Sequence, residues 1–221
     1  MKALNIPVGI SNFEKIRNNG FYYVDKTGLI EELLKTEAEV TLITRPRRFG
    51  KTLGMSMLES FFDIRKNSRK LFEGLEIARQ SELCSKWMNQ CPTVSVSFRQ
   101  VDGLNFTSAY DMLTMVFADL YNKHLYLLED SHVTEFQKKT FTNIAHGCGS
   151  EKEVKSSLVL LTTMMQQHYG KAVVLLIDEY DVPVAKANAH GYYNEMLDVM
   201  KGLLQALKDN QALCFAVVTG C

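Results

Sequence analysis

The stretch RPRRFGKT occupies residues 45–52. It follows the β-branched run Val40–Thr44, which predicts a buried strand, and it leads into a helical pattern that extends to about Phe62. A strand, a glycine-containing loop and a helix in this order are the context of a phosphate-binding loop, whose general pattern is GxxxxGK followed by Ser or Thr. Arg45 stands where that pattern has its first glycine. The stretch therefore predicts a P-loop with one unusual position.

The residue types of this loop indicate its chemistry. Gly50 permits a tight turn whose N–H groups face anionic oxygens, and the helix start adds a favourable dipole. Lys51 can reach the β- and γ-phosphates of a nucleotide and assist catalysis, and the Thr52 hydroxyl can ligate magnesium. We therefore expect ATP and Mg²⁺ to bind here. The residues expected to hold the phosphates are Arg47, Arg48, Phe49, Gly50, Lys51, Thr52 and Leu53.

Three roles are open for Arg47 and Arg48. Arginine suits bidentate phosphate contact, but both side chains could equally be solvated, or could bind a partner or nucleic acid. Because P-loops turn their backbone toward the nucleotide and their side chains away, we expect at least one arginine to face outward.

A second motif lies at the end of another apolar run. Val173–Asp178 predicts a buried strand, and Glu179 follows it directly. This is the form of a Walker B motif, in which Asp178 holds magnesium and Glu179 orients or deprotonates the attacking water. Taken alone, the pair could also be an acidic turn that closes a strand. Together with the P-loop, it predicts the acidic half of an ATP site.

Two further apolar runs, Thr93–Phe98 and Leu213–Thr219, also read as buried strands. Wholly apolar strands separated by helices predict a mainly parallel sheet covered on both faces, a three-layer α/β sandwich. The Asp-Glu pair places the domain in the P-loop division with an additional strand between the two motifs, for which Thr93–Phe98 is the candidate. Thr219 ends the last run, where a hydroxyl could sense the γ-phosphate or simply suit a strand end.

Periodicity and capping boxes predict the helices between these strands. The predicted helices are Thr27–Glu37, Ser108–Leu128 with a cap at Ser108, Ser131–Ile144, Ser150–His168 with a cap at Ser150, and Tyr192–Lys208. The aromatic phrase Phe21–Tyr23 could stack on adenine, although core packing is the commoner role of such residues.

Composition narrows the class of protein. Lys and Arg number 25, as do Asp and Glu, so there is no overall attraction to nucleic acid or anionic membrane. Five cysteines without C-x-x-C spacing argue against a disulfide framework or a zinc site. The start of the chain lacks a signal-peptide core, and the longest apolar run, Ala172–Ile177, is too short to span a membrane. These features predict a cytoplasmic protein.

The 221 residues suit a single domain, residues 1–221, with residues 1–38 packed on it as an N-terminal segment. The last predicted strand ends at the last residues of the chain. We therefore expect a fragment of a longer protein, truncated after the fourth core strand.

Several phrases resemble the bacterial AAA-ATPase-like domain family over nearly the whole chain. They are residues 44–53, the opening IPVGI with Phe13, YYVDKT at 22–27, IDEYD at 177–181 and VTG at 218–220. The family shares the arginine-rich loop form, so the resemblance makes Arg45 a family trait. It implies an ATPase with a P-loop fold. It also implies that full-length members often continue into a restriction-endonuclease-like domain, an effector that is absent here.

Three functional hypotheses remain open. The first is Mg²⁺-dependent ATP hydrolysis that drives or gates the effector, and the second is an ATP-binding switch with little hydrolysis. The third is the ATPase part of a nucleic-acid-processing protein. It rests on the loop arginines and on a second basic cluster, Arg65, Lys66, Arg69 and Lys70. An oligomer is compatible with each hypothesis.

Overall fold

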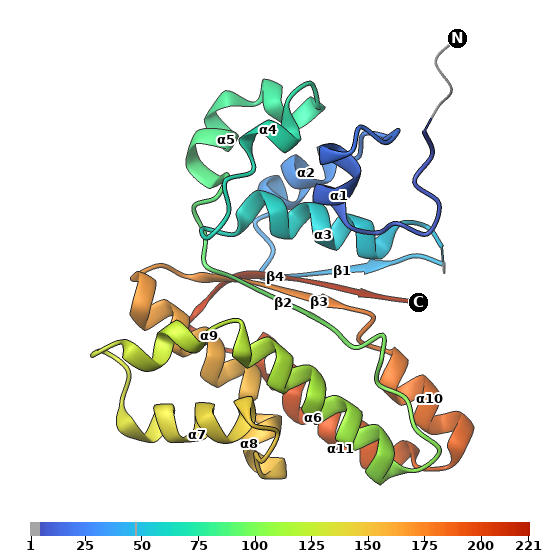
Figure 1. Cartoon of the computed structure of the whole chain (residues 1–221), viewed down its shortest axis with the longest axis vertical. Helices are drawn as coiled ribbons and strands as arrows, with labels where there is room; N and C mark the ends of the chain where they lie inside the picture. Colours follow the sequence, from blue (N-terminus) through green and yellow to red (C-terminus); the bar gives the residue numbers. More distant parts are fainter. Residues whose placement is uncertain (1–4, 47) are drawn as a thin grey trace.

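A single parallel sheet organises the molecule. The structure, a computed structural model, describes residues 5–46 and 48–221. Its four strands are β1 (Val40–Thr44), β2 (Thr93–Ser97), β3 (Val173–Asp178) and β4 (Leu213–Gly220), in the spatial order β1-β4-β3-β2 (Figure 1). All three pairings are parallel. The strands lie where the apolar runs predict them, with ends that agree to within one residue.

Helices cover both faces of the sheet (Figure 1). The N-terminal layer contains α1 (Phe13–Asn18), α2 (Gly28–Thr36), α3 (Lys51–Phe62), α4 (Arg69–Phe72), η1 (Glu76–Arg79) and α5 (Ser81–Trp87). The opposite layer contains α6 (Phe106–Asn122), η2 (Leu125–Glu129), α7 (Glu135–Ala145), α8 (Glu151–Lys155), α9 (Ser157–Tyr169), α10 (Val182–His190), α11 (Tyr193–Leu204) and η3 (Gln205–Leu207). The predicted three-layer α/β sandwich is confirmed.

The central strand β3 divides the core by its side-chain alternation. Val173, Leu175 and Ile177 join the core under α6 to α11, whereas Val174 and Leu176 join the core under α1 to α5. All six residues of β3 are buried, which is what a strand covered on both faces requires.

The strand that lies between the two motifs in the sheet is β4. It pairs with β1 on one side and with β3 on the other. The candidate named from sequence, Thr93–Phe98, forms β2, which pairs with β3 only and lies at the outer edge. The additional strand exists as predicted, but chain order does not reveal which strand takes that position, because parallel crossovers can skip a neighbour.

Several helix boundaries differ from those predicted. The cap of α6 is Asn105, with Ser108 as the third residue of its capping box, and α7 begins after Thr134. The cap at Ser150 is confirmed, but the predicted helix divides at Ser156, whose hydroxyl donates to the carbonyl oxygens of Lys152 and Glu153. Such side-chain bonds compete with the helical backbone pattern.

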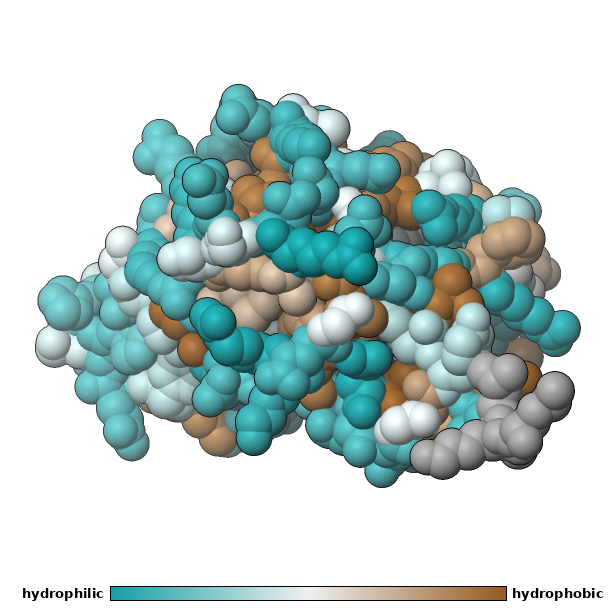
Figure 2. All heavy atoms as spheres, turned by 90° about the horizontal axis from the view of Figure 1, so that it is seen from above, coloured by the Kyte–Doolittle hydropathy of each residue, from teal (hydrophilic) through white to brown (hydrophobic). Residues whose placement is uncertain are grey.

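In the described part of the N-terminal segment, residues 5–38, α1 and α2 bury side chains against the helix that follows the phosphate loop. Phe13 and Ile30 are fully buried in the same core as Met55 and Leu58 of α3. The Phe13 amide also donates to the Ser56 hydroxyl at 3.0 Å. Seen from the side of the N-terminal helical layer, the surface is mostly hydrophilic, with small and separate hydrophobic patches (Figure 2).

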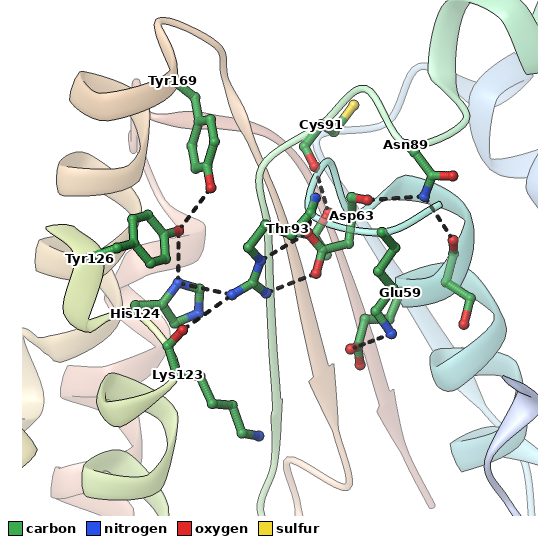
Figure 3. A network of polar contacts seen from close by, with 12 residues as sticks. Glu59, Asp63, Asn89, Cys91, Thr93, Lys123, His124, Tyr126 and Tyr169 are labelled. Carbon is green, nitrogen blue, oxygen red and sulfur yellow. Dashed lines mark hydrogen bonds and ion pairs between the residues drawn. The ribbon is translucent and has the colours of Figure 1, made fainter. Parts of the chain in front are cut away.

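A polar network connects the two helical layers around β2 (Figure 3). Arg65 donates to both oxygens of the buried Asp63, from Nε at 3.0 Å and from Nη2 at 2.8 Å. Its Nη1 lies 3.4 Å from Nδ1 of His124, which in turn lies 3.2 Å from the Tyr126 hydroxyl. Since α3 runs from the carboxyl ends of the strands to their amino ends, this network lies at the end of the sheet opposite the phosphate loop.

Candidate functional site

The carboxyl ends of the strands bring the predicted site residues together. Parallel pairing places the loops after β1, β3 and β4 at one edge of the sheet, where ligands bind in open α/β folds. The register pairs Thr44 with Gly220, which follows Thr219, and Ser97 with Asp178, so polar residues from all four strands meet there.

The phosphate loop has the backbone form that its glycine predicts. Gly50 has φ 76° and is the N-cap of α3, a position at which left-handed backbone favours glycine. Arg48 also has a positive φ, 70°, which costs a residue with a Cβ about 1–2 kcal/mol. The first turn of α3 has neither a side-chain cap nor an acidic residue. The N–H groups of that turn therefore favour an anion.

Side-chain exposure separates the remaining loop residues. Arg48 is exposed and Phe49 is 60% exposed, which agrees with the expectation that loop side chains turn outward. Leu53 is partly buried against the N-terminal core, so only its backbone is free for a ligand. Arg47 lies outside the described residues.

Lys51 is buried, with 8% of its surface exposed, at the first position of α3. Its ammonium donates to the carbonyl oxygen of Arg45 at 2.6 Å and to Sγ of Cys221 at 3.0 Å. The charge is therefore held between the phosphate loop and the end of β4, where a polyphosphate chain on the loop would meet it.

The Asp178 carboxylate connects side chains of α3, β2 and β4 by hydrogen bonds. Its Oδ2 accepts from the Thr52 hydroxyl at 2.9 Å and from the Ser97 hydroxyl at 3.4 Å. Its Oδ1 accepts from the Thr219 hydroxyl at 2.5 Å. The carboxylate is only 4% exposed, so three hydroxyl donors stabilise a charge that burial would otherwise penalise. Ser97 was not singled out in the sequence, and its register position opposite Asp178 is what reveals it.

The oxygen atoms around Asp178 suit a hard divalent cation. Mg²⁺ prefers oxygen ligands, keeps several waters and takes few protein ligands beside substrate phosphates. The Thr52 hydroxyl and the Asp178 carboxylate, 2.9 Å apart, match that donor set. Within the described residues, no group of three or more His, Cys, Asp or Glu side chains could hold a metal. Thr52 and Asp178 would supply two oxygen ligands to such a cation, and a bound phosphate and waters would supply the others.

Glu179 leaves β3 in left-handed backbone, with φ 54°. Its amide donates to the Thr219 hydroxyl at 3.2 Å, which fixes the backbone turn at the end of the strand. Its carboxylate, which is partly exposed, makes no hydrogen bond or ion pair with another described residue. The side chain is therefore free to contact a ligand or water at the strand end.

A cavity of about 370 Å³ continues from the phosphate loop between α2 and α3. Lys51, Arg45 and Thr219 line its phosphate end, and Leu29, Met55 and Leu58 give it apolar walls. Two carboxylates, Glu32 and Glu76, also line it. No local pattern predicts α2 as a wall of this cavity, because the cavity joins residues far apart in the chain.

The aromatic phrase before α2 takes no part in this cavity. Tyr23 packs edge-on against Phe13 at 5.2 Å between ring centroids, and its hydroxyl donates to Sδ of Met57. Tyr22 is 53% exposed. The core role is therefore the one observed for Tyr23.

Half of the second basic cluster is paired with neighbouring carboxylates. Arg65 pairs with Asp63, and Lys66 pairs with Glu14 at 2.6 Å and Glu59 at 3.1 Å. Two of its four cations are thus neutralised locally, which weakens the case for a nucleic-acid surface there.

The fold and the site together define a P-loop NTPase: a parallel sheet of order β1-β4-β3-β2, a glycine-capped phosphate loop after β1, and an aspartate at the end of β3 bonded to the loop threonine. Within this class, the chain belongs to the AAA-ATPase-like family, described as "Predicted AAA-ATPase", whose family model matches residues 7–221. Membership supports binding of ATP.

One relative is an "Uncharacterized protein in vnfD 5'region" from Azotobacter chroococcum mcd 1, which is 27% identical over 223 residues. The match covers 100% of this chain and 38% of the relative, so the chain spans well under half of that protein. No solved structure matches the chain. Within residues 5–46 and 48–221, no helix is long and apolar enough to cross a membrane.

Proposed function

We propose that this chain binds ATP with Mg²⁺ at the carboxyl edge of its sheet and hydrolyses the γ-phosphate with water. The observation that carries the proposal is the 2.9 Å hydrogen bond between Thr52 and Asp178. These residues are 126 positions apart in the sequence, and each belongs to one of the two motifs that an ATP site requires.

The roles of the side chains follow from their positions. The amides from Gly50 onward cradle the phosphates, and the Lys51 ammonium stabilises charge on the β- and γ-phosphates. Thr52 and Asp178 hold Mg²⁺, which neutralises phosphate charge when it is bound. Glu179 orients the attacking water and accepts its proton, and the Thr219 hydroxyl keeps Asp178 and the Glu179 backbone in register.

The nucleoside fits the cavity between α2 and α3. Gly54 supports this placement, because it lies within α3, lines the cavity and has no described neighbour outside the local helix backbone within 4 Å of the position of a Cβ. A glycine inside a helix costs about 1 kcal/mol relative to alanine. Its open side is therefore explained by a ligand that passes close to the helix.

A second candidate is an ATP-binding switch with little hydrolysis. It is favoured by Glu179, whose carboxylate makes no hydrogen bond to a described residue that would hold it at an attacking water. In a longer protein, either activity could gate an effector domain, including a nuclease or another nucleic-acid-processing domain.

ATP binding and phosphate release by wild type, Lys51→Ala and Glu179→Gln test the two candidates. We expect Lys51→Ala to abolish tight ATP binding, whereas Glu179→Gln should bind ATP and release little phosphate. Lys152→Ala, an exposed substitution on α8, is the matched control for loss of a lysine. Wild-type binding without phosphate release would favour the switch, and intact ATP affinity in Lys51→Ala would refute both candidates.

A further inference from the structure

Lys26, which precedes α2, lies over the phosphate loop. Its ammonium is 3.8 Å from the position that a Cβ on Gly50 would occupy. Lys26 also lines the cavity that contains Gly50, Lys51 and Arg45. A cation from the N-terminal segment thus stands beside the turn whose amides face the phosphates.

The backbone that carries Lys26 is held in place on both sides. Asp25 accepts from the Thr27 amide at 2.9 Å and the Thr27 hydroxyl at 2.7 Å, and its other oxygen accepts from the Glu76 amide at 2.7 Å. Burial alone would raise the pKa of Asp25, but these hydrogen bonds hold it below its ordinary value. Thr27 is fully buried, and its hydroxyl accepts from the Ile77 amide at 3.1 Å. The flanking residues are therefore anchored to η1, while Lys26, which is exposed, lines the cavity.

The Lys26 ammonium is not paired with a carboxylate of the described residues. Within residues 5–46 and 48–221, Lys26 makes no ion pair, although Glu32 and Glu76 line the same cavity. Glu76 instead approaches Gly28, where a Cβ would lie 3.3 Å from its Oε2. A lysine with a fixed backbone and an uncompensated charge beside an anion-binding loop is suited to contact phosphate.

We propose that Lys26 is a binding residue that contacts the polyphosphate of the bound nucleotide and so couples the N-terminal segment to occupancy of the site. The assignment rests on the proposed function. It differs from the roles of Lys51 and Thr52 because the charge comes from a segment that precedes β1. The N-terminal segment then becomes part of the ligand site as well as part of the fold.

Competition against a fluorescent ATP analogue, with ATP and with inorganic tripolyphosphate as competitors, tests the assignment. Tripolyphosphate has the phosphates and lacks the nucleoside. We expect Lys26→Met to lower the affinity for both competitors about tenfold, which corresponds to the loss of one charge-assisted hydrogen bond. Lys26→Arg should retain most of the affinity for both, because it keeps the charge.

Two further variants separate a phosphate contact from a general disturbance. Gly54→Leu should lower the affinity for ATP and leave the affinity for tripolyphosphate unchanged, because the leucine fills only the apolar part of the cavity. Lys35→Met, at an exposed lysine of α2 that pairs with Glu31, should change neither. The assignment is overturned if Lys26→Met binds tripolyphosphate as the wild type does, or if Lys26→Arg loses as much affinity as Lys26→Met. If Lys51→Ala binds ATP as tightly as the wild type does, the proposed function itself is refuted. That result differs from one in which Lys51→Ala loses ATP affinity and Lys26→Met keeps wild-type affinity, which refutes only the assignment of Lys26.

Discussion

The Thr219 hydroxyl donates to Oδ1 of Asp178 at 2.5 Å and accepts from the amide of Glu179 at 3.2 Å. One side chain of β4 therefore orients both the carboxylate and the backbone turn at the end of β3. Because β4 lies between β1 and β3, the last strand of the chain connects the two motifs physically.

Thr219→Val should separate catalysis from folding. Valine keeps the shape of the side chain but removes both hydrogen bonds, so Asp178 loses its shortest partner. We expect the rate of phosphate release to fall by about ten- to a hundredfold, with a smaller change in ATP affinity. Thr219→Ser restores the hydroxyl and should recover most of the rate. Measuring kcat and KM for both variants checks this, and a wild-type kcat in Thr219→Val would show that the hydroxyl is not used.

Gly54→Leu should stabilise the fold while it weakens nucleotide binding. Replacing a glycine inside α3 with a good helix former gains about 0.5–1 kcal/mol, and no described neighbour outside the local helix backbone lies within 4 Å of the new Cβ. The same side chain would enter the cavity beside Met55 and Leu58. We expect a higher midpoint of urea denaturation together with weaker ATP binding. Unchanged ATP affinity would place the nucleoside elsewhere.

Patterns in the sequence predicted the strands well because each is a short β-branched run, and β1 and β3 have the predicted ends. The proximity of Thr52 and Asp178 could also be predicted from the sequence, since parallel strands end at one edge of the sheet. Both results depend on local composition and on one general property of parallel sheets.

Other features depend on contacts between distant segments. Strand order depends on how the crossovers pack, so the position of β4 between β1 and β3 could not be predicted from the sequence. No helix was predicted between Glu179 and Tyr192, whereas α10 begins at Val182 with Pro183 in its first turn, where proline is compatible with a helix start. Lys26 resembles any exposed lysine in the sequence, and only the hydrogen bonds of Asp25 and Thr27 to η1 hold it beside the loop.

Arg65→Met should destabilise the chain without changing the nucleotide site. It leaves the carboxylate of Asp63, which is 1% exposed, without its guanidinium partner, a change that costs about 2–4 kcal/mol. Arg69→Met, at an exposed arginine on α4, should cost less than about 0.5 kcal/mol. Urea denaturation gives both values. Adding Asp63→Asn to Arg65→Met should recover part of the loss, and ATP affinity should match the wild type because the network lies at the other end of the sheet.

His124 should make the stability of the chain depend on pH. Burial, with a smaller effect of Arg65 and Lys123, lowers the pKa of His124 to about 3. Since Arg65 can only donate, Nδ1 of His124 accepts and the ring is neutral in the folded state. Between pH 6.5 and pH 3 the unfolded chain therefore binds a proton that the folded chain does not, and the free energy of unfolding falls as the pH falls.

The expected loss between pH 7.5 and pH 5 is about 2 kcal/mol for a histidine with an ordinary unfolded pKa. Urea denaturation at several pH values measures this slope. His124→Asn keeps an acceptor but cannot take up the proton, so its stability should depend less on pH across this window. His146→Gln, at an exposed histidine, should keep the wild-type slope. If His124→Asn and the wild type lose stability in parallel, the buried ring is not the group that titrates.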